Sequence, residues 1–281
     1  MSGGGCLESA TEPILRLSGS EKRLGMSILT SNPILEASQL EAKLDPQAMP
    51  RHIAVIMDGN RRWAKERRLP VLLGHRAGVK TFRMIIETCR ELGVKTLTAY
   101  AFSAENWRRS PPEIKLLMGL FEQYTRTERE KLVRTGVRFQ PIGRYKNLPE
   151  PVLKEFEATA EATAHNQGMV LNLCVNYGGR DEIVEATRRI AAEVAAGRLA
   201  QEAITEELFS SYLFTGGQQD PDLLIRTSGE IRISNFLLWQ VAYTEFYFTP
   251  AYWPDITRSH LIEAILEYQR RERRYGGGKG E

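Results

Sequence analysis

The stretch HIAVIMDGNRRW at residues 52–63 combines a strand pattern with a cluster of polar side chains. Residues 52–57 are apolar and rich in β-branched side chains, which is typical of a buried strand. Gly59 and Asn60 favour a turn, so the strand should end just before Asp58. A turn needs neither the carboxylate of Asp58 nor the two guanidinium groups that follow. The stretch therefore predicts a buried strand with a functional site at its carboxyl end.

The composition of the chain is that of a globular protein. Of its 281 residues, 42% are hydrophobic and 26% are charged, which is enough for one sizeable core. The net charge of +3 is small, so it predicts no polyanionic partner such as a nucleic acid. The three cysteines lie far apart and the four histidines are scattered, and neither set has the spacing of a disulfide framework or a metal site.

The N-terminal segment differs from the rest of the chain. Residues 1–48 are rich in Gly, Ser, Glu and Pro and lack periodicity, which is typical of a flexible extension. A transit peptide is the alternative, but the frequent acidic residues argue against it. No apolar run is long enough to span a membrane and no secretory signal is recognisable. We expect a cytoplasmic protein with one domain at residues 49–281.

Six strand-like runs alternate with helical patterns after residue 50. The strand-like runs cover residues 52–57, 96–102, 137–142, 170–175, 223–226 and 244–248. The helical patterns cover residues 78–92, 112–135, 149–166, 180–196, 205–213 and 258–274. This order predicts a single α/β domain with a mainly parallel sheet flanked by helices. In such sheets, ligands bind beyond the carboxyl ends of the strands.

Polar and basic side chains follow five of the predicted strands. They lie at residues 58–63, 103–109, 143–144, 176–180 and 226–234. One such segment alone would be read as a turn with a solvated arginine, but five at one sheet edge predict a binding site. Guanidinium groups and helix N-termini bind phosphate oxygens, which predicts a phosphorylated ligand. Asp58 among arginines predicts Mg²⁺ between the carboxylate and the phosphate; the alternatives for Asp58 are an ion pair with Arg62 or a helix N-cap.

Two features of the sequence allow more than one interpretation, namely the residues around Asp58 and an apolar segment. The chain has no Walker motif and no G-x-G-x-x-G after a strand. Asp58 and Asn60 resemble the D-x-D of phosphatases without its second aspartate, so a hydrolase with an aspartyl-phosphate is the runner-up. The apolar residues 114–121 predict either ordinary core packing or the wall of an apolar tunnel.

Five ordered blocks resemble the signature blocks of the cis-prenyltransferase (isoprenyl transferase) family. They are MDGNRRWAK at 57–65, GHRAG at 74–78, YAFSAENW at 100–107, NYGGR at 176–180 and LIRTSGEIRISNFLLWQ at 224–240. The resemblance covers residues 50–277 and is closest to bacterial undecaprenyl diphosphate synthases. It implies a six-stranded, mainly parallel sheet with surrounding helices, an apolar tunnel and a homodimer.

The resemblance also implies a reaction. Isopentenyl diphosphate would be added repeatedly, with Mg²⁺, to an allylic diphosphate such as farnesyl diphosphate, and each new double bond would be cis. The product would be a long polyprenyl diphosphate such as undecaprenyl diphosphate, a lipid carrier precursor for cell-wall glycan synthesis. A peripheral contact with the membrane would help its release. A catalytically silent partner subunit is the other reading, but Asp58, Asn106, Arg226 and Arg232 are all present and favour an active enzyme.

Three residues match catalytic or metal positions of the family. Asp58 matches the essential Mg²⁺-linked aspartate, and Glu245 matches a second Mg²⁺ position near the dimer interface. Asn106 matches the position assigned as the proton acceptor. A neutral amide has little basicity, so we expect Asn106 to orient the substrate while a diphosphate oxygen takes the proton.

The substrate-binding residues that the resemblance implies form three groups. The allylic diphosphate would be bound by Gly59, Asn60, Arg61, Arg62 and His75. The cleft and its loop would be lined by Trp63, Ser103, Ala104, Glu105 and Trp107. The isopentenyl diphosphate would be held by Arg109, Arg226, Arg232, Ile233 and Ser234.

One position departs from the family pattern in a way that affects binding. Relatives often carry an arginine that contacts the allylic diphosphate where this chain has Val71, whereas many carry glycine where it has Arg61. Losing one charge-assisted hydrogen bond would weaken binding by about 1.5–3 kcal/mol. Arg67, Arg68 or Arg76 could compensate for this loss.

Overall fold

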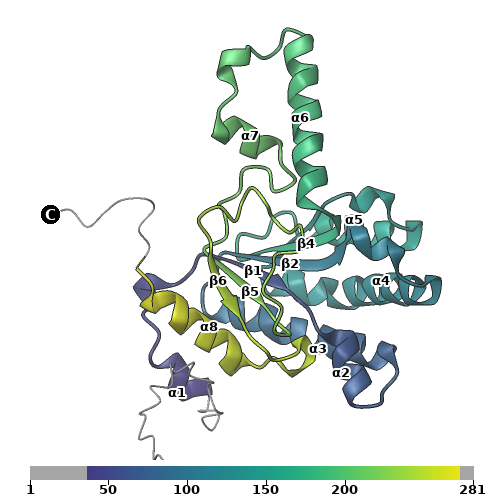
Figure 1. Cartoon of the computed structure of the whole chain (residues 1–281), viewed down its shortest axis with the longest axis vertical. Helices are drawn as coiled ribbons and strands as arrows, with labels where there is room; N and C mark the ends of the chain where they lie inside the picture. The colour runs from purple at the N-terminus through teal and green to yellow at the C-terminus, as the bar shows by residue number, and fades with distance from the viewer. Residues whose placement is uncertain (1–36, 273–281) are drawn as a thin grey trace, which may run out of the picture. The chain divides into compact units, whose positions relative to one another are not determined.

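The computed structural model of the chain describes residues 37–272 and centres on one six-stranded sheet (Figure 1). The strands are β1 (His52–Ile56), β2 (Thr96–Ser103), β3 (Arg138–Ile142), β4 (Val170–Tyr177), β5 (Leu223–Arg226) and β6 (Glu245–Phe248). Their order in the sheet is β3-β4-β2-β1-β5-β6, and every neighbouring pair is parallel. The predicted α/β class is confirmed, and all six strands lie within two residues of their predicted limits.

Helices flank the sheet. They are α1 (Ala37–Glu41), α2 (Asn60–Glu66), α3 (Val71–Glu91), α4 (Pro111–Arg134), α5 (Glu150–Ala162), α6 (Gly179–Ala195), α7 (Glu206–Tyr212) and α8 (Arg258–Arg270). Short 3₁₀ turns are η1 (Pro46–Ala48), η2 (Ala104–Arg108), η3 (Tyr145–Asn147), η4 (Gln201–Ala203) and η5 (Trp253–Asp255). No helix in this part of the chain is both long enough and apolar enough to cross a bilayer.

The two faces of the sheet bury separate cores. Along β1, Ile53 and Val55 point into a core shared with α3, α4, α5 and α8. Ala54 and Ile56 point to the other face, where Phe236 and the segment around it cover them. Side chains alternate along a strand, so both faces of β1 are apolar because both are covered. Figure 1 shows α6 and α7 on the side of the sheet opposite to α3 and α8.

Helix α3 begins earlier than its sequence pattern predicts, and the pattern does not predict α2. Both differences arise at one contact between the two helices. A Cβ atom at Gly74 would lie 2.1 Å from the backbone oxygen of Asn60, so glycine is needed for close packing rather than to break a helix. The only buried residue of α2 is Ala64. A helix this short depends on tertiary contacts, which a search for periodicity does not detect.

The end of the predicted N-terminal extension is packed against the domain. Of residues 1–48, the structure describes 37–48, which form α1 and η1. Leu40 is buried, and Glu41 pairs with Arg258 of α8 at 3.0 Å. This part is therefore not a flexible extension, because an apolar contact and an ion pair hold it. Residues 1–36 and the predicted end of the last helix at residue 274 lie outside the described residues.

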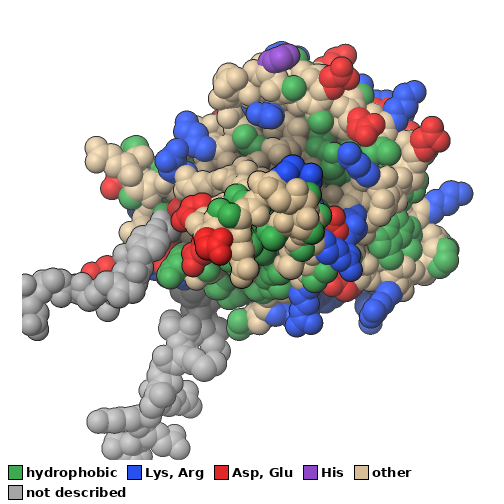
Figure 2. Space-filling model, turned by 90° about the horizontal axis from the view of Figure 1, so that it is seen from above, with side chains coloured by type: hydrophobic (Ala, Val, Ile, Leu, Met, Phe, Trp, Pro, Cys, Tyr) green, Lys and Arg blue, Asp and Glu red, His purple; other side chains and the backbone are tan. Residues whose placement is uncertain are grey.

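Basic side chains are not gathered into a stripe on the face seen in Figure 2. Lys and Arg side chains lie there among acidic, hydrophobic and other side chains. This face therefore offers no concentrated basic surface to an anionic partner.

Candidate active site

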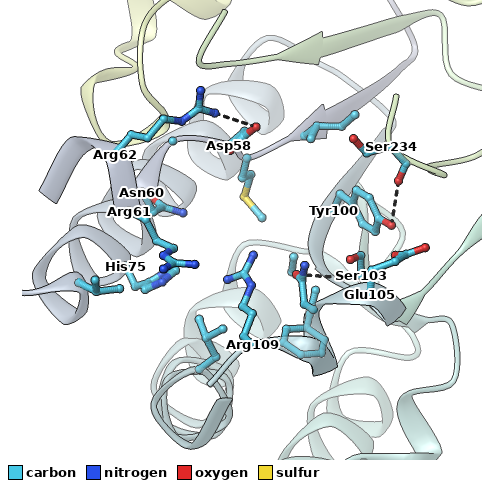
Figure 3. A pocket seen from close by; sticks show the side chains of 18 of the residues that line it. Asp58, Asn60, Arg61, Arg62, His75, Tyr100, Ser103, Glu105, Arg109 and Ser234 are labelled. Atoms are coloured by element: carbon cyan, nitrogen blue, oxygen red, sulfur yellow. Dashed lines mark hydrogen bonds and ion pairs between the residues drawn. The ribbon is translucent and has the colours of Figure 1, made fainter. Parts of the chain in front are cut away.

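The carboxyl ends of three neighbouring strands border a cavity of about 1100 Å³ (Figure 3). In the sheet, Ile56 at the end of β1 lies beside Tyr100 of β2 and Arg226 at the end of β5. Each strand continues into one of the polar segments that the sequence analysis identified. The expectation that these segments meet at one sheet edge is therefore met for β1, β2 and β5.

Most of the predicted site residues line this cavity. They are Asp58, Gly59, Asn60, Arg61, Arg62, His75, Ser103, Glu105, Asn106, Arg109, Arg226 and Ser234. They come from α2, α3 and η2, from the last residues of β2 and β5, and from the segments that follow these elements and β1. Contacts across the sheet edge and helix packing bring these distant segments together.

Six predicted residues do not line the cavity. They are Trp63, Ala104, Trp107, Arg232, Ile233 and Glu245. The indole of Trp63 donates to Asp255 at 2.6 Å and stacks beneath the guanidinium of Arg67. The indole of Trp107 donates to Asn176 at 2.8 Å. Both indoles are therefore engaged with other partners outside the cavity wall.

Glu245 lies at the other end of the strands from Asp58. It begins β6 opposite Leu223, the first residue of β5, whereas Arg226 marks the carboxyl end of β5. The Glu245 carboxylate pairs with Arg271 at 3.0 Å. One chain therefore does not bring Asp58 and Glu245 to a common metal ion. Among residues 37–272, no three potential metal ligands form a cluster.

Asp58 is held between two guanidinium groups. Its Oδ2 lies 3.0 Å from Nη2 of Arg226 and 3.1 Å from Nη2 of Arg62. Thr227 fixes the backbone here, because its hydroxyl donates to the Asp58 carbonyl at 2.7 Å and accepts from the Asp58 N–H. The alternative ion pair with Arg62 is thus present, and it coexists with the position of Asp58 in the cavity wall. Gly59 follows with a φ of 107°, in the left-handed region that favours glycine.

Arg226 is buried and almost fully engaged. Its Nη1 donates to the carbonyl of Arg232 at 2.5 Å and to the hydroxyl of Ser234 at 2.7 Å. Its Nε is buried without a hydrogen-bond partner among the described residues. Arg232 supports this site through its backbone, since its guanidinium pairs with Glu230. The Arg226 side chain therefore presents one free N–H from a fixed position.

A second basic group gathers around a carboxylate that the sequence analysis missed. Glu113, in the first turn of α4, lies 3.1 Å from Arg109 and 3.6 Å from both Arg61 and His75. Figure 3 shows Arg61, His75 and Arg109 pointing toward one another. The spacing of Arg109 and Glu113, four residues apart near a helix start, was the available clue.

His75 is neutral at physiological pH. Burial lowers its pKa to about 4, and the positive charge of Arg109 contributes in the same direction. Its Nε2 is buried without a hydrogen-bond partner in the described part of the chain. Burial also lowers the pKa of Arg109, the cation beside it. A neutral imidazole can offer a hydrogen bond here without adding a further charge.

The loop after β2 closes another side of the cavity. The backbone N–H of Ser103 donates to Oδ1 of Asn106 at 3.2 Å, as part of a capping box at the start of η2. Asn235 donates to the Glu105 carboxylate at 2.9 Å and accepts from the N–H of Arg180. The amide oxygen of Asn106 is thus occupied locally, and Asn235 links this loop to the start of α6.

The walls also contain residues outside the predicted set of catalytic, metal and substrate-binding residues. They are Ile56, Met57, Lys65, Leu69, Val71, Tyr100, Ala101, Phe102, Leu117 and Asn235. Of these, Val71 and Leu117 were discussed in the sequence analysis, as a departure from the family pattern and as part of the apolar segment 114–121. Arg67, Arg68 and Arg76 are not among the lining residues, so they do not replace a cation at Val71. The basic lining residues are Arg61, Arg62, Lys65, Arg109 and Arg226, against the acidic Asp58 and Glu105. This excess of positive charge suits an anionic ligand.

An apolar cavity of about 90 Å³ adjoins the basic one. The two share Met57, Asn60, His75, Ala101 and Leu117 in their walls. The smaller cavity is also lined by Phe82, Leu120, Phe121, Tyr124 and Leu173. Leu117, Leu120 and Phe121 belong to the segment for which core packing and a tunnel wall were the alternatives. The site therefore has a charged compartment beside an apolar one.

Comparison with known proteins agrees with this arrangement. The family model described as putative undecaprenyl diphosphate synthase matches residues 56–276. An isoprenyl transferase of Geobacter sulfurreducens is 50% identical over 233 residues, which are 83% of this chain and 95% of the relative. An isoprenyl transferase of Bacillus subtilis is 51% identical over 229 residues, which are 82% of this chain and 88% of the relative.

Solved structures show the same fold. Lavandulyl diphosphate synthase from Lavandula x intermedia, in complex with dimethylallyl diphosphate, has a TM-score of 0.80 and 41% identity, covering 82% of this chain and 99% of that one. A probable undecaprenyl diphosphate synthase from Campylobacter jejuni has a TM-score of 0.68 and 33% identity, covering 81% of this chain and 98% of that one. The chain belongs to the undecaprenyl diphosphate synthase family and is a prenyl transferase.

Proposed function

We propose that this prenyl transferase elongates prenyl chains by adding isopentenyl diphosphate repeatedly to an allylic diphosphate, with farnesyl diphosphate as the expected primer. Each new double bond would be cis, and the product would be a long polyprenyl diphosphate such as undecaprenyl diphosphate. The observation that carries this proposal is the basic cavity that shares a wall with an apolar one. A prenyl diphosphate has the same division into a charged head and an apolar tail.

The basic cavity is lined by two residues with an unpartnered nitrogen atom, and one of these atoms, Nε of Arg226, is an N–H donor for a diphosphate group. Nε of Arg226 and Nε2 of His75 are buried and lack hydrogen-bond partners among the described residues. A buried donor without a partner costs about 1–3 kcal/mol, which a ligand oxygen would recover on binding. Arg61 and Lys65 on α2 add positive charge to the lining of the cavity, and Arg226 adds it from the end of β5. Two diphosphate groups could thus bind side by side, one near α2 and one near Arg226.

The residues present fit Mg²⁺ that is bound mainly by substrate oxygens. Both guanidinium contacts of Asp58 fall on Oδ2, which leaves Oδ1 without a hydrogen-bond partner in the described part of the chain. Mg²⁺ commonly uses one or two carboxylates together with substrate phosphates. Asp58 would hold the ion, and the ion would neutralise charge on the leaving diphosphate. A metal ion bound by Glu245 would require a different site, away from this cavity.

The chemistry requires charge stabilisation and the loss of one proton. The C–O bond of the allylic diphosphate breaks, with both electrons going to the leaving oxygen, where Arg61, Arg62 and His75 stabilise the developing charge. The isopentenyl double bond supplies the electrons of the new C–C bond. A proton then leaves the adjacent carbon to a diphosphate oxygen. Asn106 orients the substrate in this scheme, because its amide is weakly basic and its oxygen is already hydrogen-bonded.

The apolar tail requires a tunnel, and the adjoining apolar cavity would be its beginning. Each buried CH₂ group contributes roughly 0.8 kcal/mol, so a farnesyl tail could contribute on the order of 10 kcal/mol.

We further propose a cytoplasmic homodimer. The exposure of Ile231 (79%) and Tyr243 (69%) supports an apolar contact with a second copy.

A labelled-substrate assay tests the function directly. The protein is incubated with labelled isopentenyl diphosphate, farnesyl diphosphate and Mg²⁺, and the extracted lipid is sized. A long product that is lost in Asp58→Ala supports the proposal. If a product forms only with a primer shorter than farnesyl diphosphate, the proposed primer is wrong. If no primer is elongated, the chain is better explained as a catalytically silent partner subunit.

A further inference from the structure

The junction between α2 and α3 exposes an apolar strip. Leu69, Val71 and Leu73 are exposed at 38%, 37% and 40%, although large hydrophobic side chains are mostly buried in this domain. Pro70 lies between them and is also exposed. Four neighbouring apolar residues at one surface position are more than the scattered single exposures that need no explanation.

Basic side chains flank this strip. Arg68 precedes it and Arg76 follows it on α3, and both are exposed. No side-chain hydrogen bond or ion pair is found for either within residues 37–272. Leu73, Arg76 and Lys80 are spaced three and four residues apart, so they share one face of α3, away from the buried His75. We call the group Arg68, Leu69, Pro70, Val71, Leu73 and Arg76 the α2–α3 surface.

The α2–α3 surface continues into the mouth of the basic cavity. Leu69 and Val71 line the cavity as well as being exposed, and so does Lys65 on α2. Anything that lies on this surface is therefore at the entrance to the site.

We propose that the α2–α3 surface docks on the anionic headgroups of a lipid bilayer, with Leu69, Val71 and Leu73 inserted into the interface. The inference builds on the proposed function, in which the product carries a long apolar tail that partitions into lipid. The free positive charges of Arg68 and Arg76 complement acidic lipids, and apolar side chains add the second contribution that stable binding needs. In this orientation the cavity mouth faces the lipid that receives the product.

A protein partner fits this surface less well. A stable protein interface buries about 800 Å² on each partner, which four small exposed side chains cannot supply. The two unpaired cations precede and follow the apolar strip along the chain, and two separate charges suit the many acidic headgroups of a bilayer better than one specific acidic group. A bilayer needs only shallow insertion and a few basic contacts.

Vesicle sedimentation of the full chain tests this proposal. We expect binding to vesicles of phosphatidylcholine with phosphatidylglycerol, weaker binding to phosphatidylcholine alone, and loss of binding at high salt. Leu73→Asp should lower the vesicle-bound fraction strongly, and Arg68→Ala and Arg76→Ala should each lower the partition constant by about fivefold. Val184 is exposed at 47% on α6, so Val184→Asp is the matched control and should bind as the wild type does.

Two further readouts separate the possible outcomes. Leu73→Gln and the melting temperature of each variant show whether a loss of binding reflects misfolding. Elongation of farnesyl diphosphate without vesicles should stay within about twofold for Leu73→Asp, because Leu73 does not line the cavity. Failure of that elongation in the wild type contradicts the proposed function, not the docking. Equal vesicle binding by wild type and Leu73→Asp, or no binding to acidic vesicles, overturns the docking proposal.

Discussion

Nη2 of Arg226 lies 3.0 Å from Oδ2 of Asp58, across the carboxyl ends of the neighbouring strands β5 and β1. The Arg226 side chain is only 4% exposed, so its charge depends on a carboxylate partner more than a surface arginine would. Asp58 therefore has a structural role, the pairing of the buried Arg226, in addition to its proposed catalytic role. A change at Asp58 should therefore be visible in both stability and turnover.

We predict that Asp58→Asn reduces the elongation rate at least about 100-fold, because the amide keeps the shape but removes the negative charge. The free energy of unfolding should fall by about 1–3 kcal/mol, since Arg226 loses its ionic partner. Steady-state kinetics and urea unfolding measure the two effects. Asp181→Asn is the control, because Asp181 pairs with Arg144 outside the cavity and should leave turnover unchanged. Near-normal turnover in Asp58→Asn would contradict the proposed role.

The pH dependence of stability should report the two buried histidines. Burial lowers the pKa of His52 and of His75 to about 4, whereas a histidine in the unfolded chain titrates near 6.5. Between these values the unfolded chain binds more protons, so the free energy of unfolding falls as the pH drops from about 6.5 to about 4. Each histidine would contribute about 3 kcal/mol, which is fully present above about pH 6.5.

Urea unfolding at about pH 7 and about pH 5 measures this dependence. The free energy of unfolding of the wild type should fall over this interval. That of His75→Asn should fall less, because the variant lacks the contribution of one titrating histidine. The comparison with the variant removes the contribution of carboxylates, which both proteins share. An identical loss in both proteins would mean that His75 titrates at its ordinary pKa in the folded state.

The sheet and the location of the candidate site could be predicted because the strands and the polar segments after them are visible as local patterns. Parallel strands bring their carboxyl ends to one edge, so the polar residues after β1, β2 and β5 had to meet. Asp58 and Arg226 are far apart in sequence, yet their positions at strand ends were enough to place them together. The chemistry of the side chains at that edge led to the expectation of a phosphorylated ligand.

Features that depend on contacts between distant segments could not be predicted in this way. The indole of Trp63 is directed to Asp255, and the indole of Trp107 to Asn176, and neither pairing is visible in a sequence motif. Glu113 lies in the first turn of a helix that the sequence predicts, but its contacts with Arg61 of α2 and His75 of α3 arise only when these helices pack together. Helix α2 has little periodicity, because its packing rests on small residues.

Arg61 should supply the positive charge that Val71 lacks. Both residues line the cavity, and Arg61 lies 3.6 Å from Glu113, which holds it at the wall. We predict that Arg61→Ala raises the KM for the allylic diphosphate by roughly 10- to 100-fold, the equivalent of one charge-assisted hydrogen bond. Adding Val71→Arg to that variant should restore much of the affinity, because the new guanidinium lies on the same cavity wall.

The control for this pair is Val71→Leu, which keeps the apolar character and should not rescue Arg61→Ala. Initial rates at varied concentrations of the allylic primer separate KM from kcat. An unchanged KM in Arg61→Ala would assign the contact to Lys65, the other basic residue of α2 that lines the cavity.

The length of the product should depend on the apolar cavity beside the basic one. Leu120 lines only the apolar cavity, so Leu120→Trp should fill it while leaving the diphosphate contacts intact. A growing chain that cannot enter loses roughly 0.8 kcal/mol for each CH₂ group that stays in water, and it should be released early. We therefore predict shorter products with little change in the rate of the first addition, measured by sizing the labelled lipid.

Leu116→Trp is the matched control, because Leu116 is half-buried on the same helix and lines neither cavity. Overpacking costs about 1–3 kcal/mol, so both variants must be shown to remain folded at the assay temperature. If both variants yield products of wild-type length, the growing prenyl chain must leave the basic cavity by another route. The apolar cavity would then be a packing defect of the core, and the charged half of the site would have to be explained without it.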